Sequence, residues 1–309
     1  MIIDTDTASD DAVALVLALT DPRAQVLAVT VVSGNVPLTP AVQNALYTVE
    51  LCGADVPVHA GADRPLQRPA QYATDVHGQD GMGDIGLVLH GREPRPEHAV
   101  DVLIDLVRRN PGEITLVTLG PLTNIALALR KAPDIAALIP RVVMMAGAAD
   151  GLGNVTPAAE FNVWVDPEAA DIVYRSGMPL VQVGWDVSRK DATLTLAEGD
   201  ELAARGPLGE FCVRIQRQLV EFCREVTHID GFDLPDPVTM AVALEPAVAT
   251  RVERRYVVVE TSGDHTTGAT LVDHLGVTGE PPNVDVVLAA DRARFREMLL
   301  QAGAARAGR

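Results

Sequence analysis

The stretch "MIIDTDTASDDAVALVLAL" (1–19) decides the class of fold. Its first residues form an apolar run that ends at Asp4, which is typical of a strand buried on both faces of a sheet. Ser9 and the two acids after it then precede an apolar helical pattern, as residues at the start of a helix do. The segment therefore predicts a strand followed directly by a helix, which is the unit of α/β proteins.

The same alternation continues along the chain. Helical patterns with start signals separate further runs rich in Val, Ile and Leu, which lie at 26–35, 113–120, 141–147 and 180–186. Near-continuous apolarity is typical of parallel strands that are covered on both faces. We therefore expect an α/β fold with a mostly parallel central sheet surrounded by helices.

The C-terminal part of the sequence departs from this rhythm. The runs "RRYVVVETSG", "GATLVDH" and "NVDVVLAAD" predict a small antiparallel appendage. We expect one domain over residues 1–309, with a disordered tail at 302–309. Two irregular stretches, 60–97 and 222–237, are long for loops of a compact domain, which favours a functional role for both.

Composition limits the partners that the chain can bind. The formal net charge is −17 and no run of Lys or Arg offsets it, so we expect neither nucleic acid nor an anionic membrane as a partner. Three widely spaced cysteines outside any metal-ligand pattern are typical of a reducing compartment. The sequence shows no basic leader, signal segment or apolar stretch of about 18 residues. We therefore expect a cytoplasmic protein.

Four carboxylates crowd the first eleven residues. Asp4 and Asp6 share a face of an extended segment, and Asp10 and Asp11 lie in the first turn of the next helix. Helix capping accounts for one or two of these acids, but not for the pair at the end of a strand, where open α/β sheets bind ligands. Repulsion between neighbouring carboxylates raises their pKa values, unless a bound cation balances the charge. Oxygen ligands without His or Cys favour Ca²⁺ or Mg²⁺.

The segment from Asp4 to Ala8 allows a minor alternative. Asp-Thr-Asp-Thr-Ala resembles the Asp-x-Asp-x-Thr/Val nucleophile motif of haloacid dehalogenase-like phosphatases. Ala8 stands where that motif has Thr or Val, and neither Lys131 nor Lys190 lies in a convincing phosphate-binding context. This alternative predicts a release of inorganic phosphate that depends on Asp4.

Eight segments together resemble the inosine-uridine-preferring nucleoside hydrolase family. They are "DTDTASDDA" (4–12), with Thr-Ala where Pro-Gly is usual, "VSGNVPLTPAVQNA" (32–45), "VHGQDGMGD" (76–84), "VTLGPLTNIALAL" (117–129), "VVMMAGA" (142–148), "GNVTPAAEFNVWVDPEAA" (153–170), "DVSRK" (186–190) and "DPVTMA" (236–241). They follow the family's order over most of the chain. The resemblance implies a doubly wound α/β core and hydrolysis of the N-glycosidic bond of ribonucleosides to ribose and free base.

The resemblance also implies a metal site. The family holds a Ca²⁺ ion that binds the 2′- and 3′-hydroxyls of the ribose. Its protein ligands map to Asp6, Asp11, the backbone carbonyl of Leu119 and Asp236. Asp6 would also take the proton from the attacking water. These roles suit the chemistry, because breaking the bond builds positive charge on the sugar.

Contacts with the ribose follow from the same resemblance, and they fall on Asp10, Asn35, Met145, Glu160 and Asn162. Taken singly, each residue has an ordinary structural interpretation as a turn, core or capping residue. In an extended segment Glu160 and Asn162 would share a face, which favours a joint role for the two.

The chain departs from the family directly before Asp236. Many members have a His there that protonates the departing base, whereas this chain has Pro235, which has no proton to give. We expect another acid, with His228 as the nearest candidate, or a substrate that needs less activation. We also expect His77 to contact the base and Trp185 to stack on it.

Two alternative functions would use the same ribose-binding residues. In the first, the chain hydrolyses a different N-riboside, because Pro235 alters the base pocket. In the second, it is a ribose- or nucleoside-binding protein weakened in catalysis. The partner is a small nucleoside in each case, and the resemblance implies a homodimer or homotetramer. Base preference stays open, because the residues that would touch the base lie in the two irregular stretches.

Overall fold

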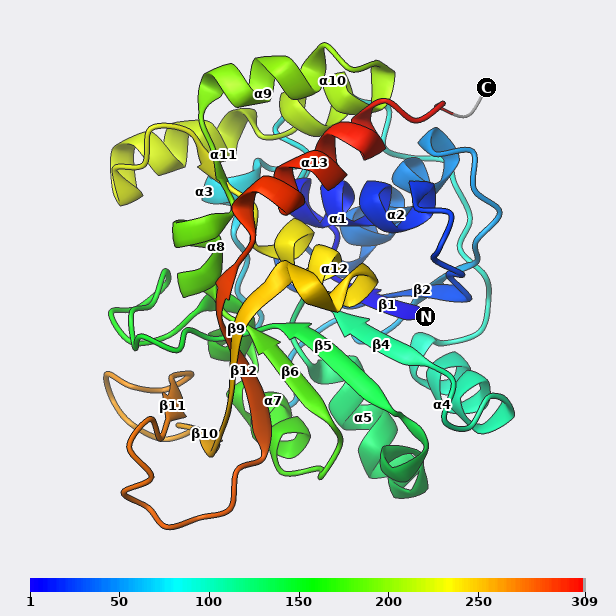
Figure 1. Cartoon of the computed structure of the whole chain (residues 1–309). Helices are drawn as coiled ribbons and strands as arrows, with labels where there is room; N and C mark the ends of the chain where they lie inside the picture. Colours follow the sequence, from blue (N-terminus) through cyan, green and yellow to red (C-terminus); the bar gives the residue numbers. More distant parts are fainter. Residues whose placement is uncertain (308–309) are drawn as a thin grey trace.

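An eight-stranded sheet runs through the computed structural model, which describes residues 1–307 (Figure 1). In spatial order its strands are β3 (Val58–Ala60), β2 (Ala28–Val31), β1 (Ile2–Thr5), β4 (Thr115–Thr118), β5 (Arg141–Met145), β6 (Leu180–Val183), β12 (Val284–Ala290) and β9 (Ala249–Arg255). All neighbours pair in parallel except β9, which is antiparallel to β12. This confirms the predicted mostly parallel α/β sheet.

Helices cover both faces of the sheet. One face carries α1 (Ser9–Thr20), α2 (Leu38–Leu51), α12 (Pro235–Leu244) and α13 (Arg292–Gly303), and the other carries α4 (Ala99–Arg109), α5 (Thr123–Lys131) and α7 (Pro167–Tyr174) (Figure 1). Each layer packs its own cluster of buried apolar side chains against the sheet. The other helices are α3 (Thr74–His77), α6 (Phe161–Val165), α8 (Trp185–Asp191), α9 (Leu196–Ala203), α10 (Pro207–Arg214) and α11 (Arg217–Phe222). Short 3-10 turns cover 133–138 and 246–248, and a π-helical turn covers 223–227.

The strand order reverses next to β1. From β1 the chain proceeds outward to β2 and β3 on one side, and then returns to β4, β5 and β6 on the other side. The segments that leave β1 and β4 therefore diverge above the carboxyl ends of the strands, which opens a crevice there. Every residue of β1 is buried, so the acid that follows it is carried into the centre of the molecule.

The C-terminal prediction is partly wrong. β10 (Val257–Val259) and β11 (Thr270–Val272) do form a small antiparallel sheet, and β7 (Thr193–Leu194) and β8 (Phe232–Asp233) form another. The run 284–290, however, is β12 of the central sheet, where it pairs antiparallel with β9 on one side and in parallel with β6 on the other. Its side chains at 284, 286 and 287 are fully buried, so the apolar run belongs to the main core.

The predicted disordered tail also needs correction. Helix α13 continues to Gly303, and Ala305 and Ala307 pack against the core. Residues 308–309 lie outside the described part of the chain.

The three cysteine residues do not form disulfide bonds. Cys212 and Cys223 are buried, Cys52 is partly buried, and all three thiols are free. Within residues 1–307, no helix has both the length and the apolar character that crossing a bilayer requires.

Candidate active site

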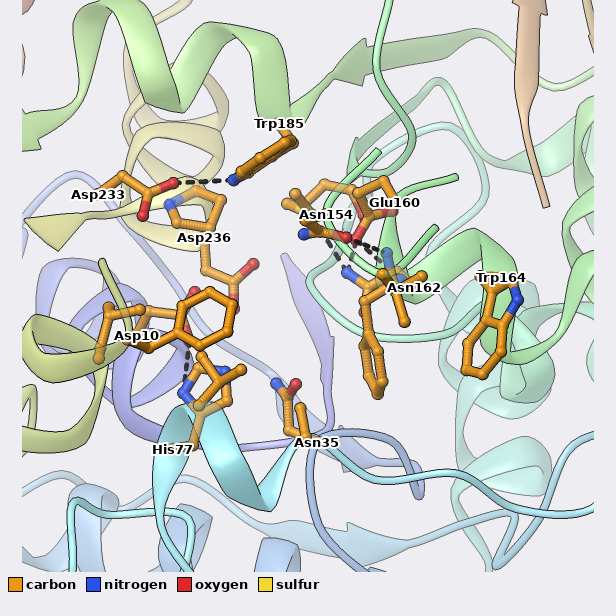
Figure 2. A pocket seen from close by; sticks show the side chains of 18 of the residues that line it. Asp10, Asn35, His77, Asn154, Glu160, Asn162, Trp164, Trp185, Asp233 and Asp236 are labelled. Atoms are coloured by element: carbon orange, nitrogen blue, oxygen red, sulfur yellow. Dashed lines mark hydrogen bonds and ion pairs between the residues drawn. The ribbon is translucent and has the colours of Figure 1, made fainter. Parts of the chain in front are cut away.

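A cavity of about 320 Å³ lies at the carboxyl ends of the central strands (Figure 2). It is lined by most of the residues that the sequence singled out, namely Asp10, Asn35, His77, Leu119, Met145, Glu160, Asn162, Trp185 and Asp236. Asp6 and Asp11 are fully buried beside it. The structure therefore brings together acids from β1, α1 and α12 with polar groups from five other segments.

The acids form one buried cluster. Carboxylate oxygens of Asp10, Asp11 and Asp236 lie within 4.8 Å of one another. Asp6 joins them at the end of β1, where its Oδ2 accepts a hydrogen bond of 2.6 Å from the backbone N–H of Asn35. The Oδ1 atoms of Asp6 and Asp10 are buried without a hydrogen-bond partner. Unpaired buried carboxylate oxygens are costly unless something else satisfies them.

Burial and mutual repulsion act strongly on these groups. Desolvation and then the charge of Asp11 raise the pKa values of Asp6 and Asp10 well above the usual range. Burial and the neighbouring carboxylates do the same to the pKa of Asp236, and burial also raises the pKa of Asp11. A hard divalent cation would relieve this repulsion, and the donor set of carboxylate oxygens fits such an ion.

Asp11 and Asp4 are held by neutral donors. Thr5 Oγ1 donates to Asp11 Oδ1 at 2.5 Å, and the Ala8 N–H donates to Asp11 Oδ2 at 2.9 Å, so Asp11 also caps the first turn of α1. Asp4 Oδ2 accepts from Thr30 Oγ1 at 2.6 Å and from Asn124 Nδ2 at 2.8 Å. Asp4 thus links β1 to β2 and α5 through its Oδ2, while its Oδ1 is buried without a hydrogen-bond partner.

Two glycines confine the carboxylate of Asp6. A Cβ on Gly34 would lie 2.1 Å from Asp6 Oδ2, and a Cβ on Gly120 would lie 2.5 Å from Asp6 Oδ1. Both glycines follow parallel strands, β2 and β4, which flank β1. The absence of a side chain at these two positions is what lets the carboxylate fit between the strand ends.

Glu160 and Asn162 organise the opposite wall of the cavity. Glu160 Oε2 accepts from the Gly147 N–H, and its Oε1 accepts from the Asn162 N–H, both at 2.8 Å. Asn162 Nδ2 donates to the carbonyl oxygen of Leu119 at 2.7 Å and to that of Met145 at 3.2 Å. Burial raises the pKa of Glu160 to about 7.

The expected extended geometry of this pair is wrong. Glu160 is the N-cap of α6, and Asn162 lies in its first turn. The two side chains meet the cavity because the helix begins at its wall, and not through the alternation of a strand.

His77 closes the side of the cavity near α1. Its Nδ1 lies 2.8 Å from Ser9 Oγ and 3.8 Å from Asp10 Oδ1. Burial lowers the pKa of His77 to about 4, so its imidazole is neutral near pH 7.

Trp185 and Asp233 also line the cavity. Trp185 Nε1 donates to Asp233 Oδ2 at 2.9 Å (Figure 2), and Ser188 Oγ donates to the same oxygen at 3.0 Å. The Arg189 guanidinium lies 4.4 Å from the centroid of the Trp185 ring and pairs with Asp150. Sequence reasoning missed Asp233, although its place in the irregular stretch 222–237, three residues before Asp236, was a usable signal.

His228 does not belong to this arrangement. Its side chain is exposed, its φ of 57° is left-handed, and it is not among the residues that line the cavity. Pro235 and Thr227 line the cavity instead. The predicted role of His228 as leaving-group acid therefore has no support from its position.

The fold and site are those of an α/β enzyme with a buried acidic cluster beside a cavity at the carboxyl edge of its sheet. Residues 1–297 match the family model described as inosine-uridine preferring nucleoside hydrolase, and the chain belongs to this family. The membership confirms the resemblance found in the sequence. It leaves the phosphatase alternative without support.

Relatives and solved structures agree with this assignment. The chain is 41% identical over 308 residues to the pyrimidine-specific ribonucleoside hydrolase RihA of Salmonella agona, with 97% of each chain covered. A plant nucleoside hydrolase superposes with a TM-score of 0.92 at 35% identity, covering 99% of this chain and 98% of the other. The purine-preferring ribonucleoside hydrolase of Gardnerella vaginalis gives 0.90 at 31% identity, covering 98% and 97%.

Proposed function

We propose that the chain is a Ca²⁺-dependent ribonucleoside hydrolase that releases ribose and a free base. The observation that carries this proposal is the convergence of Asp6, Asp10, Asp11 and Asp236 beside one cavity, where the Oδ1 atoms of Asp6 and Asp10 are buried without a hydrogen-bond partner. The similar enzymes described above include one pyrimidine-specific and one purine-preferring member, so similarity alone leaves the base preference open.

The metal would be held by Asp6, Asp11, Asp236 and the carbonyl of Leu119, with Asp10 close enough to contribute. Ca²⁺ takes six to eight oxygen ligands, so water and ribose hydroxyls would complete its shell. When bound, the ion would supply charge that orients a water and makes it more acidic.

Asp6 is the residue placed to take a proton from that water. Its Oδ2 is occupied by the Asn35 N–H, while its Oδ1 is buried and free of hydrogen bonds. The two oxygens therefore have separate tasks, one of which fixes the carboxylate and the other of which accepts the proton. Gly34 and Gly120 leave the carboxylate no alternative position.

The remaining side chains would hold the sugar and stabilise its developing charge. Asp10 and Asn35 would face the ribose from one side, and Glu160 and Asn162 would face it from the other (Figure 2). Met145 also lines the cavity. Positive charge builds on C1′ and the ring oxygen as the bond breaks, and preorganised negative and dipolar groups stabilise it. The base would then extend toward His77 and Trp185.

A panel of nucleosides tests the proposal. Release of reducing sugar from inosine, adenosine, uridine and cytidine is measured with Ca²⁺ and after chelation. We expect ribose from at least one of them, loss of activity with the chelator, and recovery when Ca²⁺ returns. Asp6→Asn should reduce kcat at least about 10³-fold, because the general base is lost. Binding of the nucleosides without any release of ribose would instead support the alternative of a nucleoside-binding protein.

We also propose the cytoplasmic location and the homodimer or homotetramer that the sequence favours. Light scattering of the purified chain measures the assembly, and a monomeric mass would contradict it.

A further inference from the structure

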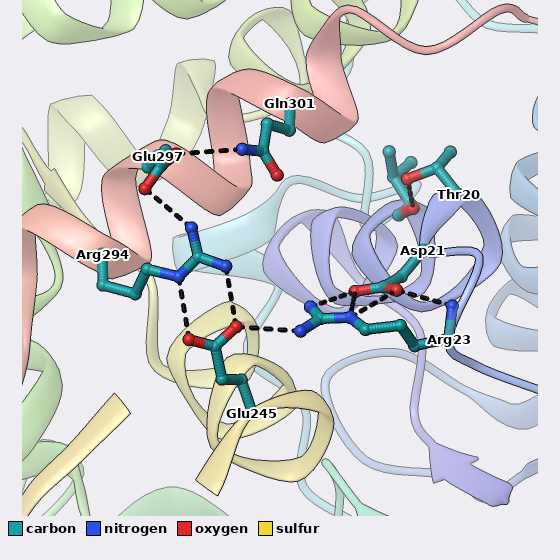
Figure 3. A network of polar contacts seen from close by, with 8 residues as sticks. Thr20, Asp21, Arg23, Glu245, Arg294, Glu297 and Gln301 are labelled. Atoms are coloured by element: carbon teal, nitrogen blue, oxygen red, sulfur yellow. Dashed lines mark hydrogen bonds and ion pairs between the residues drawn. The ribbon is translucent and has the colours of Figure 1, made fainter. Parts of the chain in front are cut away.

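Two of the cavities differ in how their polar groups are satisfied. The smaller one, of about 190 Å³, lies between the end of α1 and α13 (Figure 3). Its cations are already neutralised, because Glu245 pairs with Arg23 at 2.9 Å and with Arg294 at 2.7 Å. Groups that are already paired offer little to a ligand, whereas a side chain of the main cavity, His77, has a ring nitrogen to spare.

His77 is held in place by its backbone and by one nitrogen of its ring. Its N–H donates to the Ala73 carbonyl at 3.0 Å, and its carbonyl accepts from the Gly83 N–H at 2.8 Å. Its Nδ1 lies 2.8 Å from Ser9 Oγ, in the first turn of α1. Within residues 1–307 its Nε2 forms no hydrogen bond, although the residue lines the cavity. The ring therefore uses Nδ1 inside the protein and leaves Nε2 for a ligand.

The hydroxyl of Ser9 serves His77 and not the helix. The N-cap of α1 is Ala8, and its N–H is taken by Asp11, so the Ser9 side chain does not cap this helix. Ser9 is fully buried, and His77 Nδ1 is the one hydrogen-bond partner of its Oγ in the described part of the chain. The Ser9 carbonyl accepts from Gln216 Nε2 at 2.8 Å, which fixes this turn beside the imidazole.

The hydroxyl hydrogen decides which of the two groups donates. A buried donor without an acceptor is costly, and Nδ1 of His77 is the acceptor within reach of Ser9. If Nδ1 carried a proton, as it does in one neutral tautomer and in the imidazolium ion, the hydroxyl hydrogen would have no acceptor. Ser9 therefore donates to Nδ1, and the ring proton lies on Nε2.

Asp10 opposes this arrangement. Its Oδ1 lies 3.8 Å from His77 Nδ1 (Figure 2), and it is buried without a hydrogen-bond partner. A carboxylate in this position favours a proton on Nδ1, which would turn Nε2 into an acceptor. The hydroxyl of Ser9 is the group that keeps the proton on the other nitrogen.

We propose that Ser9 is a positioning residue that fixes His77 as the Nε2–H tautomer, so that His77 presents a hydrogen-bond donor and no acceptor to the bound base. Its partner would be an acceptor atom of the base, such as a ring carbonyl oxygen or an unprotonated ring nitrogen. The tautomer follows from contacts within the protein. Its use on a base rests on the proposed function and deepens it.

Nitrogen NMR tests the tautomer without a substrate. The histidines are labelled with ¹⁵N, spectra are recorded with Ca²⁺ present, and the His77 signals are those that disappear in His77→Gln. Protonated and unprotonated ring nitrogens differ widely in chemical shift, and we expect an unprotonated Nδ1 and a protonated Nε2. Ser9→Ala should move the ring proton toward Nδ1, because the pull of Asp10 is then unopposed. Ser9→Thr, which keeps a hydroxyl, should leave it on Nε2.

Ser176→Ala is the matched control. The Ser176 hydroxyl donates to the Val173 carbonyl at the end of α7, and the residue does not line the cavity. This variant should leave the His77 signals unchanged. A proton on Nδ1 in the wild type, or His77 signals that Ser9→Ala does not change, would overturn the inference even if ribosides are hydrolysed.

Steady-state kinetics tests the consequence for the base. Ser9→Ala should lower kcat/KM for the preferred nucleoside about five- to tenfold, the size expected for one neutral hydrogen bond, and Ser9→Thr should restore it. An unchanged kcat/KM in Ser9→Ala would overturn the role of the donor at the base. If no riboside is hydrolysed at all, the proposed function fails, and the NMR result still decides the role of Ser9.

Discussion

The carboxylate of Asp6 has no free space on either side. Gly34 and Gly120 approach it from neighbouring strands, and a methyl group on either one would overlap its oxygens. Because these glycines do not have positive φ values, their role is close approach and not backbone freedom.

We therefore expect Gly34→Ala to displace Asp6 and to lower kcat about 10²-fold or more, since small displacements of a catalytic group have effects of this size. Gly112→Ala is the control, because Gly112 has a φ of 77° and nothing near the site of an added Cβ. That variant should lose about 1 kcal/mol of stability and keep its kcat. Equal kcat values for both variants would contradict the role of Gly34.

Glu160 gives the stability a dependence on pH that can be separated from other groups. Burial raises its pKa from 4.5 to about 7, so the folded state binds a proton that the unfolded state releases between these values. The resulting stabilisation is complete below pH 4.5 and is lost as the pH rises through 7.

Between pH 5 and pH 8 the wild type should lose about 2 to 3 kcal/mol that Glu160→Gln does not lose. Urea unfolding of both proteins at the two pH values, with a chelator present, measures the difference. Parallel losses in the two proteins would show that Glu160 is ionised throughout this range.

At the scale of elements, Asp166 joins three segments. It is fully buried and is the N-cap of α7, where its Oδ1 accepts from the Ala169 N–H. Its Oδ2 accepts from Thr123 Oγ1 at the start of α5 and from the Leu66 N–H in the irregular stretch 60–97. The cap was predictable from Asp-Pro before a helical pattern, whereas the two distant partners were not.

Asp166→Ala should lower the free energy of unfolding by about 2 to 4 kcal/mol, because three donors lose their acceptor in the interior. Asp291 offers a matched control, since it caps α13 through the Arg294 N–H alone and is exposed. Its substitution by Ala should cost about 1 kcal/mol. A similar cost at both positions, measured in urea, would mean that the contacts beyond the cap contribute little.

The elements that the sequence predicted well are those with strong local signals. Short apolar runs, followed by helical patterns with start signals, identify β1, β2, β4, β5 and β6 and the helices between them. The run at 284–290 was assigned to the wrong sheet because its pairing with β6 joins segments about 100 residues apart. β7 and β8 have two residues each, which is too short for any periodic pattern.

The residues of the site also divide into those that a local pattern predicts and those that depend on distant contacts. The acids after β1 are predictable because strand and helix positions follow from local pattern, and the family resemblance adds Asp236. The stretch 222–237 resisted prediction, because its short strand β8 depends on contacts with α8 and β7, which lie far away in the sequence. For this reason Asp233 was overlooked and His228 was favoured.

At the scale of the whole molecule, the acidic cluster opposes folding until its charge is balanced. An ion that binds only the folded chain stabilises it by about 2.7 kcal/mol at a concentration of 100 times Kd. Adding Ca²⁺ to chelator-treated protein should therefore raise Tm by several degrees. Asp11→Asn should abolish most of this shift. An unchanged Tm in the wild type would mean that the cluster does not bind Ca²⁺ tightly.

The position of Asp236 has a consequence for how the protein is made. Asp6, Asp10 and Asp11 leave the ribosome well before their partner on α12, which follows more than two hundred residues later. Helix α12 packs on α1, so the first helix lacks part of its cover until then. A nascent chain shorter than this has no complete set of ligands. Capture of the ion would therefore wait until α12 has been synthesised and has packed on α1.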